Sequence, residues 1–262
     1  MRYVDIHAHL EHSRFDDLDD VIVRCEEEEV VVFTSGVNPE TNRQALALSQ
    51  RYDNVKVSFG IYPIDALKRE GDFLQEVDEY KLDDELNWIY KHRDDCVAIG
   101  EIGLDYAQED IKNDELAREK QKEVFRKILR FAKKINKPVV IHSRKAEEDA
   151  INILEEADMK KVVMHCFSGK KGLIKRARDN GWYFSIPPVI KRLQHFQYLV
   201  ELVPLSQLLT ETDAPYLSPI AGERNEPINV KSSIEEIARI KEMPVSKVRE
   251  EIFNNTRRLF DL

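Results

Sequence analysis

Short apolar, β-branched runs alternate with longer amphipathic segments along the whole chain. The short runs have no polar face, which is typical of parallel strands that are covered on both sides. Eight strands are predicted, at residues 2–7, 30–35, 55–61, 96–101, 138–142, 162–165, 182–186 and 207–211. Helices are predicted at residues 18–28, 40–51, 82–92, 114–135, 146–156, 170–180, 192–202, 230–241 and 245–259.

The number and order of these elements indicate the fold class. Eight βα units in a chain of 262 residues match the size of a (β/α)₈ TIM barrel, an α/β fold. A doubly wound open sheet is the alternative, because alternation alone does not distinguish a closed sheet from an open one. No linker rich in Pro, Gly or Ser divides the chain, so we expect one domain over residues 1–262.

Composition narrows the class of protein. The 40 Lys and Arg residues against 49 Asp and Glu residues give a net charge of −9, which argues against bulk-charge binding to nucleic acid or membranes. Cys25, Cys96 and Cys166 form no CxxC pair and are typical of reduced thiols. No signal core or membrane-spanning run is found, so we expect a cytoplasmic protein without a membrane partner.

Imidazole and carboxylate side chains gather where the predicted strands end. Taken singly, a histidine there is more often structural, and a carboxylate is often a helix cap. In a barrel, however, the carboxyl ends of all strands meet on one face. The residues that would line one pocket there are His7, His9, Glu101, His142, His165 and Asp213.

Six nitrogen and oxygen ligands exceed what one tetrahedral zinc ion needs. Glu101 can bridge two ions, with His7, His9 and Asp213 on one ion and His142 and His165 on the other. Two divalent ions suit hydrolysis at phosphorus, where they activate water and stabilise the displacement. Imidazole-rich ligation favours Zn, Mn, Ni or Fe over Mg, but it does not fix the metal. We expect two divalent ions, which are Mg, Mn or Zn.

Several sequence blocks resemble the signature blocks of the TatD family of metal-dependent deoxyribonucleases, which are amidohydrolase-like barrels. The blocks are residues 5–10 (DIHAHL), 100–106 (GEIGLDY), 141–144 (IHSR), 165–169 (HCFSG), 211–217 (ETDAPYL), 224–227 (RNEP) and 254–260 (NNTRRLF). The resemblance implies the same six metal ligands. It also implies that Glu101 and Asp213 are catalytic, with Asp213 orienting or deprotonating the attacking water.

One block departs from the family pattern. Residues 60–64 (GIYPI) stand where many members carry two histidines, so Tyr62 either donates a hydrogen bond to a substrate phosphate or packs at the barrel mouth. Arg144, Lys170 and Lys171 are candidate phosphate contacts, although lysines at helix starts are often simply solvated. Tyr106 or Phe167 could offer a base-stacking surface, with core or rim packing as the alternative.

The resulting hypothesis is a deoxyribonuclease that hydrolyses DNA phosphodiester bonds, acting as an exonuclease on single strands or ends in DNA repair or turnover. The chain contains no sequence motif of a domain that recognises specific bases in nucleic acid. One alternative is an aminoacyl-tRNA deacylase, or another ester or amide hydrolase, that uses the same metal site. The other is an inactive barrel that serves as a binding partner, which the six intact ligand positions disfavour.

Overall fold

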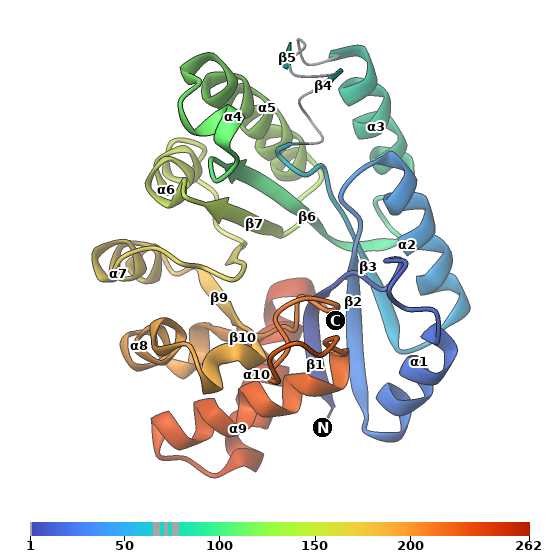
Figure 1. The fold of residues 1–262 in the computed structure, drawn as a ribbon, viewed down its shortest axis with the longest axis vertical. Coiled ribbons are helices and arrows are strands. Elements are labelled where there is room, and N and C mark those ends of the chain that lie inside the picture. The colour runs from blue at the N-terminus through green and yellow to red at the C-terminus, as the bar shows by residue number, and fades with distance from the viewer. Residues whose placement is uncertain (1, 65–68, 71–72, 75–78) are drawn as a thin grey trace.

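The computed structural model describes residues 2–64, 69–70, 73–74 and 79–262. Eight parallel strands form one sheet, in the order β1-β2-β3-β6-β7-β8-β9-β10. They are β1 (Tyr3–Ala8), β2 (Val30–Ser35), β3 (Val55–Phe59), β6 (Cys96–Asp105), β7 (Val139–Arg144), β8 (Val162–Met164), β9 (Tyr183–Ile186) and β10 (Leu208–Thr210). All eight predicted strands are therefore present (Figure 1).

The first and last strands meet, which nearly closes the sheet into a barrel. The Thr210 hydroxyl donates to the Val4 carbonyl at 2.7 Å. Just beyond the strand ends, Asp213 N donates to the His7 carbonyl at 2.8 Å, and His9 N donates to the Ala214 carbonyl at 2.7 Å. The (β/α)₈ prediction is confirmed, and the open-sheet alternative is wrong.

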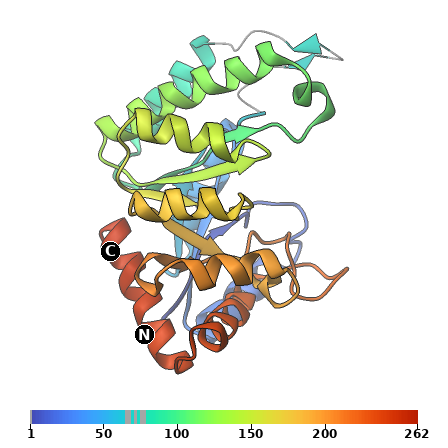
Figure 2. The same cartoon turned by 90° about the vertical axis from the view of Figure 1, so that its left-hand side faces the viewer.

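Helices cover the outside of the strands (Figure 2). The helices are α1 (Leu18–Glu27), α2 (Pro39–Arg51), α3 (Glu79–Lys91), α4 (Glu109–Lys112), α5 (Glu115–Lys134), α6 (Glu147–Glu156), α7 (Lys171–Asp179), α8 (Gln194–Leu202), α9 (Val230–Lys241) and α10 (Val245–Phe260). Helices α1, α2, α5, α6 and α7 are amphipathic, with buried apolar residues on the face toward the sheet and charged residues on the face toward solvent. No helix in the described part of the chain is both long and apolar enough to cross a membrane.

The far end of the barrel is closed by apolar side chains. Phe260, at the end of α10, packs edge to face on Phe33 of β2, with ring centroids 5.1 Å apart. Both rings belong to a buried cluster with inward residues of the other strands, such as Ile6 and Val140. Lys161, just before β8, pairs with Asp261 at the end of the chain at 2.9 Å. The end of the barrel where the strands begin is therefore filled by apolar side chains, with one ion pair at its rim.

Strand β6 is longer than predicted. It continues past Glu101 to Asp105, and Gly103 pairs with His142 of β7. Gly103 has a φ of +141°, and a β-carbon there would lie 2.0 Å from the His142 carbonyl oxygen. Only glycine permits this conformation and this approach. The strand predicted from the sequence ended at Glu101, and Asp105 was therefore left out of the site.

Several short elements, among them helix α4, were not predicted. Strands β4 (Arg69–Glu70) and β5 (Phe73–Leu74) pair antiparallel in a separate sheet. The 3₁₀ turns η1 (Pro188–Lys191), η2 (Leu205–Gln207) and η3 (Pro227–Asn229) are also additional. Elements this short have no hydrophobic period to detect.

Gly60, directly after β3, lies too close to the next strand for any other residue. A β-carbon at Gly60 would lie 2.2 Å from the Gly36 carbonyl oxygen and 2.3 Å from Glu101 N. We expect Gly60→Ala to lower the free energy of unfolding by about 1–3 kcal/mol, because backbone must move to admit the methyl group. Urea denaturation of the purified variant measures this change.

Gly172 in α7 provides the matched control. A β-carbon there meets no atom within 4 Å. Gly172→Ala should raise the free energy of unfolding by about 0.5–1 kcal/mol, since alanine loses less backbone entropy in a helix. Equal stability of the two variants would contradict the close packing described for Gly60.

Candidate metal centre

The structure brings all six predicted ligands together at the carboxyl ends of the strands. They come from β1 and the residues after it (His7, His9), β6 (Glu101), β7 (His142), the residue after β8 (His165) and the segment after β10 (Asp213). Side chains that are distant in sequence thus meet because parallel strands end at one edge.

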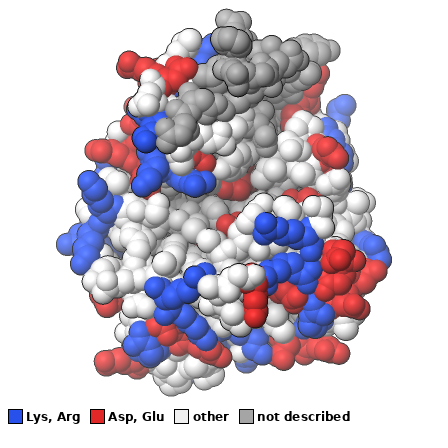
Figure 3. All heavy atoms as spheres, in the orientation of Figure 1, with Lys and Arg blue, Asp and Glu red and all other residues white. Residues whose placement is uncertain are grey.

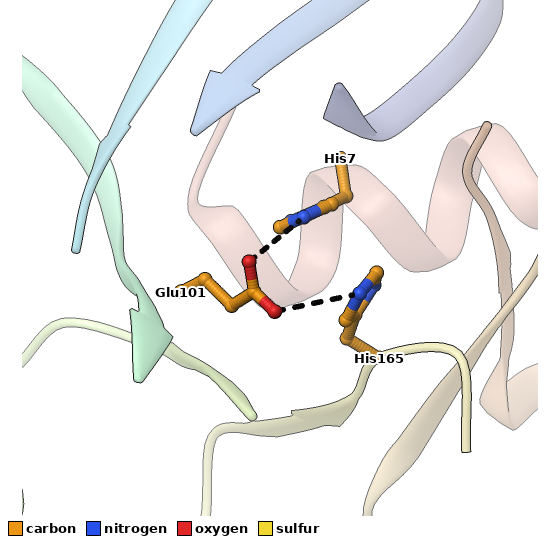
Figure 4. Close-up of side chains that lie close together, drawn as sticks. All are labelled: His7, Glu101 and His165. Atoms are coloured by element: carbon orange, nitrogen blue, oxygen red, sulfur yellow. Dashed lines mark ion pairs between the residues drawn. The ribbon is translucent and has the colours of Figure 1, made fainter. Parts of the chain in front are cut away.

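Glu101 lies at the centre of this cluster. Its Oε2 atom is 3.6 Å from His7 Nε2 and 3.8 Å from His9 Nε2. Its Oε1 atom is 2.6 Å from His142 Nδ1 and 3.8 Å from His165 Nε2. Figure 4 shows the two carboxylate oxygens directed to different imidazoles.

The charge state of Glu101 follows from these neighbours. Burial by itself would raise the pKa of this carboxyl, but the charge and hydrogen bond of His142, together with His7, hold the pKa well below its ordinary value. The carboxylate is therefore ionised although only 4% of the residue is exposed.

Asp213 completes the other side of the cluster. Its Oδ1 atom is 3.6 Å from His7 Nε2 and 3.4 Å from His9 Nε2. Burial raises the pKa of Asp213, yet the hydrogen bond from His9 and the nearby imidazoles lower it below the ordinary value. His7 thus belongs to two groups of potential metal ligands, one with Glu101 and His165 and one with His9 and Asp213.

The geometry of the cluster fits bound divalent cations, as one buried imidazole nitrogen indicates. Among the described residues, buried His7 Nε2 has no hydrogen-bond partner, whereas its Nδ1 lies 3.1 Å from the Ser35 hydroxyl. Burial lowers the pKa of His7 and favours the neutral imidazole. Ligand atoms about 2.0–2.2 Å from one ion lie roughly 3–3.5 Å apart, close to the 3.4–3.6 Å separations between Asp213 Oδ1 and the His7 and His9 Nε2 atoms.

Outer hydrogen bonds direct the Nε2 atoms of His9 and His165 into the cluster. His9 Nδ1 donates to the Ser35 carbonyl at 2.9 Å. His165 Nδ1 lies 2.5 Å from Glu211 Oε2. Such partners fix the tautomer of a ligating imidazole and hold its ring in place.

Glu211 is a buried positioning residue that the sequence reading missed. It accepts hydrogen bonds from the Ser185 hydroxyl at 2.6 Å and from Cys166 N at 2.9 Å. Burial lowers the pKa of His165, but the charge of Glu211 raises it to about 9. A signal was present, because Glu211 is the last residue of the predicted strand 207–211, as Glu101, His142 and His165 are the last residues of theirs.

His142 is held differently from the other imidazoles. Its Nδ1 faces Glu101, while its Nε2 lies 3.1 Å from Asp105 Oδ2. Burial lowers its pKa, but the Glu101 and Asp105 carboxylates raise it to about 8. His142 belongs to neither of the two ligand groups described above. Metal ligation by His142 would have to replace one of these two contacts.

Tyr62 supports this arrangement from the neighbouring strand end. Its hydroxyl donates to Asp105 Oδ2 at 2.8 Å and lies 3.2 Å from His142 Nε2. Asp105 is in turn fixed by Gln121, which accepts from Asp105 N at 2.8 Å. The structure places the Tyr62 hydroxyl inside the site, in contact with Asp105 and His142. A hydrogen bond from Tyr62 to a substrate phosphate stays a prediction.

The predicted phosphate contacts lie around the cluster in different settings. Arg144 is the last residue of β7, and its side chain is exposed. Burial raises the pKa of Tyr62, and the nearby charge of Arg144 acts in the opposite direction. Lys170 is exposed at the start of α7, and Lys171 Nζ lies 4.1 Å above the ring of Tyr198 in α8. In Figure 3, Lys and Arg side chains border a hollow in which acidic atoms are visible.

The aromatic side chains considered for base stacking are not available. Tyr106 is 6% exposed, and Phe167 has no exposed surface. The Tyr106 hydroxyl donates to Asp149 at 3.0 Å, and the Phe167 ring packs on Phe184. The stacking interpretation of Tyr106 and Phe167 is wrong, and the packing alternative holds.

The role of Glu211 can be tested by Glu211→Gln. The neutral amide keeps the shape of the side chain but weakens the hold on His165, so we expect metal affinity to fall about 10- to 100-fold. Titration calorimetry with Mn²⁺ or Zn²⁺ measures the affinity. Glu155→Gln, which alters an outer carboxylate paired with Arg176, is the control. Unchanged affinity in Glu211→Gln would contradict the positioning role.

Comparison with known proteins places this arrangement in a family. The family model described as TatD related DNase matches residues 4–261. An uncharacterized metal-dependent hydrolase of Methanocaldococcus jannaschii is 38% identical over 261 residues, which cover 99% of this chain and 97% of that protein. Human deoxyribonuclease TATDN3 is 36% identical over 260 residues, which cover 98% of this chain and 94% of that protein.

A solved structure agrees on the fold. The TatD homologue YJJV of Escherichia coli K12 superposes with a TM-score of 0.88 at 24% identity, covering 100% of this chain and 98% of that chain. The match of the family model over nearly the whole length, and the identity to the two relatives, establish the family. The chain belongs to the TatD-related DNase family, whose relatives include metal-dependent hydrolases and deoxyribonucleases.

Proposed function

We propose that this protein is a divalent-metal-dependent deoxyribonuclease that hydrolyses DNA phosphodiester bonds. The observation that carries the proposal is the pair of ligand groups that share His7, whose buried Nε2 has no other partner among the described residues. The name of the human relative, a deoxyribonuclease, supports DNA as the substrate. The cytoplasmic location, the exonucleolytic action on single strands or ends and the role in repair or turnover are further parts of this proposal.

We assign the ligands of two ions, Mg, Mn or Zn, from the contacts in the cluster. His7, His9 and Asp213 would hold one ion, and His165 and His142 the other. Glu101 suits a bridging role because its two oxygens face different imidazoles. Bound divalent ions supply Lewis acidity and lower the pKa of water.

The residues of the chain would then divide the remaining work. Ionised Asp213 would orient the attacking water and accept its proton at a carboxylate oxygen, in keeping with its lowered pKa. Glu101, which lies between the two sets of ligands, would hold them at a fixed separation. Arg144, Lys170 and Lys171 would neutralise substrate phosphates, with the Arg144 fork matching two phosphate oxygens.

The nuclease assignment is tested by Glu101→Gln. Metal-stripped wild type and variant receive Mg²⁺, Mn²⁺ or Zn²⁺ and end-labelled single- or double-stranded DNA. We expect the variant to lose more than about 100-fold in nucleotide release, since losing a central ligand should exceed the effect of losing an outer partner. Glu123→Gln, on the exposed face of α5, is the control.

The same assay distinguishes the alternative hydrolase. Aminoacyl-tRNA and a small amide are offered in parallel with the same metals. Efficient deacylation without nucleotide release by the wild type would contradict the deoxyribonuclease assignment and favour a deacylase that uses the same cluster.

Arg144→Ala tests the phosphate contact. We expect KM for DNA to rise about 10-fold, because a charge-assisted pair is removed, while the stoichiometry of bound metal stays the same. Steady-state kinetics and metal analysis of the same preparation provide both values. Loss of metal from Arg144→Ala would mean that the residue supports the cluster instead of the substrate.

A further inference from the structure

Tyr216 is an exposed aromatic residue fixed next to the metal centre. It follows Asp213 by three residues, and its backbone N donates to the Asp213 carbonyl at 2.8 Å. Its ring centroid is 6.3 Å from that of His9, at an interplanar angle of 72°. Although it stands this close to the buried cluster, Tyr216 remains 43% exposed. The ring therefore borders both the cluster and solvent.

The Tyr216 ring is held in one orientation by the loop after β1. His12 Nε2 lies 3.1 Å from the Tyr216 hydroxyl, and the two rings pack edge to face with centroids 5.6 Å apart. His12 Nδ1 accepts from Arg14 N at 3.1 Å, so in the neutral ring Nε2 carries the proton and donates to Tyr216. A ring fixed before binding loses little conformational freedom when a ligand stacks on it.

A cation accompanies this ring. The Arg14 guanidinium lies 5.5 Å from the Tyr216 centroid. The Arg14 backbone is anchored, because Arg224 Nη1 donates to its carbonyl at 2.7 Å while the Arg224 guanidinium also pairs with Asp17. Two loops that close the barrel thus present one aromatic face and one positive charge together.

An aromatic face beside a cation matches the two parts of a nucleotide. Bases of any sequence stack on an aromatic ring, and a guanidinium attracts the adjoining phosphate. We propose that Tyr216 and Arg14 form a stacking subsite for the nucleobase next to the phosphodiester bond that is cleaved. This inference rests on the proposed deoxyribonuclease function, and it assigns to the site a preference for nucleotides that carry a base.

The chain contains a matched tyrosine for control. Tyr90 is 44% exposed, and the Arg93 guanidinium lies 4.6 Å from its ring. Tyr90 is near the end of α3, shortly before β6 begins, and so lies at the end of the barrel opposite the metal centre. Tyr90 shares the chemistry of Tyr216 but lacks its position.

The test compares two oligonucleotides with the metal-loaded full chain. One carries a normal base beside the scissile phosphate, and the other carries an abasic site there. We expect Tyr216→Ala to lower kcat/KM about 5- to 100-fold on the normal oligonucleotide and to leave the abasic one unaffected. Tyr216→Phe should keep the dependence on the base, and Tyr90→Ala should match the wild type.

Three results would overturn the subsite. An equal loss on both oligonucleotides in Tyr216→Ala would indicate a structural role. No loss on either oligonucleotide in the same variant would show that the base does not stack on this ring. Loss of that dependence in Tyr216→Phe would assign the effect to the hydroxyl and not to stacking.

A binding measurement keeps this inference separate from the nuclease assignment. If the wild type cleaves neither oligonucleotide, the proposed function fails, and fluorescence of a single-stranded oligonucleotide containing 2-aminopurine decides on the subsite. Quenching by the wild type and by Tyr90→Ala, but not by Tyr216→Ala, supports stacking on Tyr216. Quenching that is absent in the wild type, or equal in the two variants, overturns it.

Discussion

The buried, ionised carboxylate of Glu101 is the constraint on which the rest of the site depends. Removing a carboxylate from water is costly unless cationic or hydrogen-bonding partners replace the solvent. Four imidazoles surround Glu101, and Asp213 faces two of them from the other side. Asp105 and Glu211 add further buried negative charge behind His142 and His165. Cations bound at the centre of this cluster would offset the negative charge of its buried carboxylates.

The barrel provides this arrangement through its strand ends and its close backbone approaches. Gly60 allows the chain just after β3 to lie directly against Glu101, and Gly103 allows β6 to continue beside β7 until Asp105 reaches His142. Apolar packing of α10 closes the opposite end, and the cluster of imidazoles and carboxylates lies at the end where the strands finish. The outer partners Ser35 and Glu211 then orient the imidazoles of His9 and His165. Fold and site are therefore consequences of the same parallel strand order.

The sequence predicted the strands because buried parallel strands have an unbroken apolar pattern, and it selected the six cluster residues because they lie at or just beyond the ends of those strands. It did not identify Asp105, because the predicted strand ended at Glu101 and the close contact of Gly103 with His142, which lets the strand continue, is a tertiary property. Glu211 was passed over because only one carboxylate was selected after the last strand. The availability of Tyr106, Phe167 and Tyr216 for stacking could not be predicted either, because exposure depends on which elements cover a ring. The net charge of −9 describes the whole chain and does not describe the site, where acidic residues are candidate ligands of cations.

The central claim is that the cluster around Glu101 holds two divalent ions. Anomalous diffraction from crystals grown with saturating Mn²⁺ tests this claim directly, because it locates the ions without relying on activity. The account predicts two anomalous peaks, one in contact with His7, His9 and Asp213 and one in contact with His165, with Glu101 between them. Fewer than two anomalous peaks in the cluster under these conditions, or manganese bound only elsewhere on the protein, would contradict it.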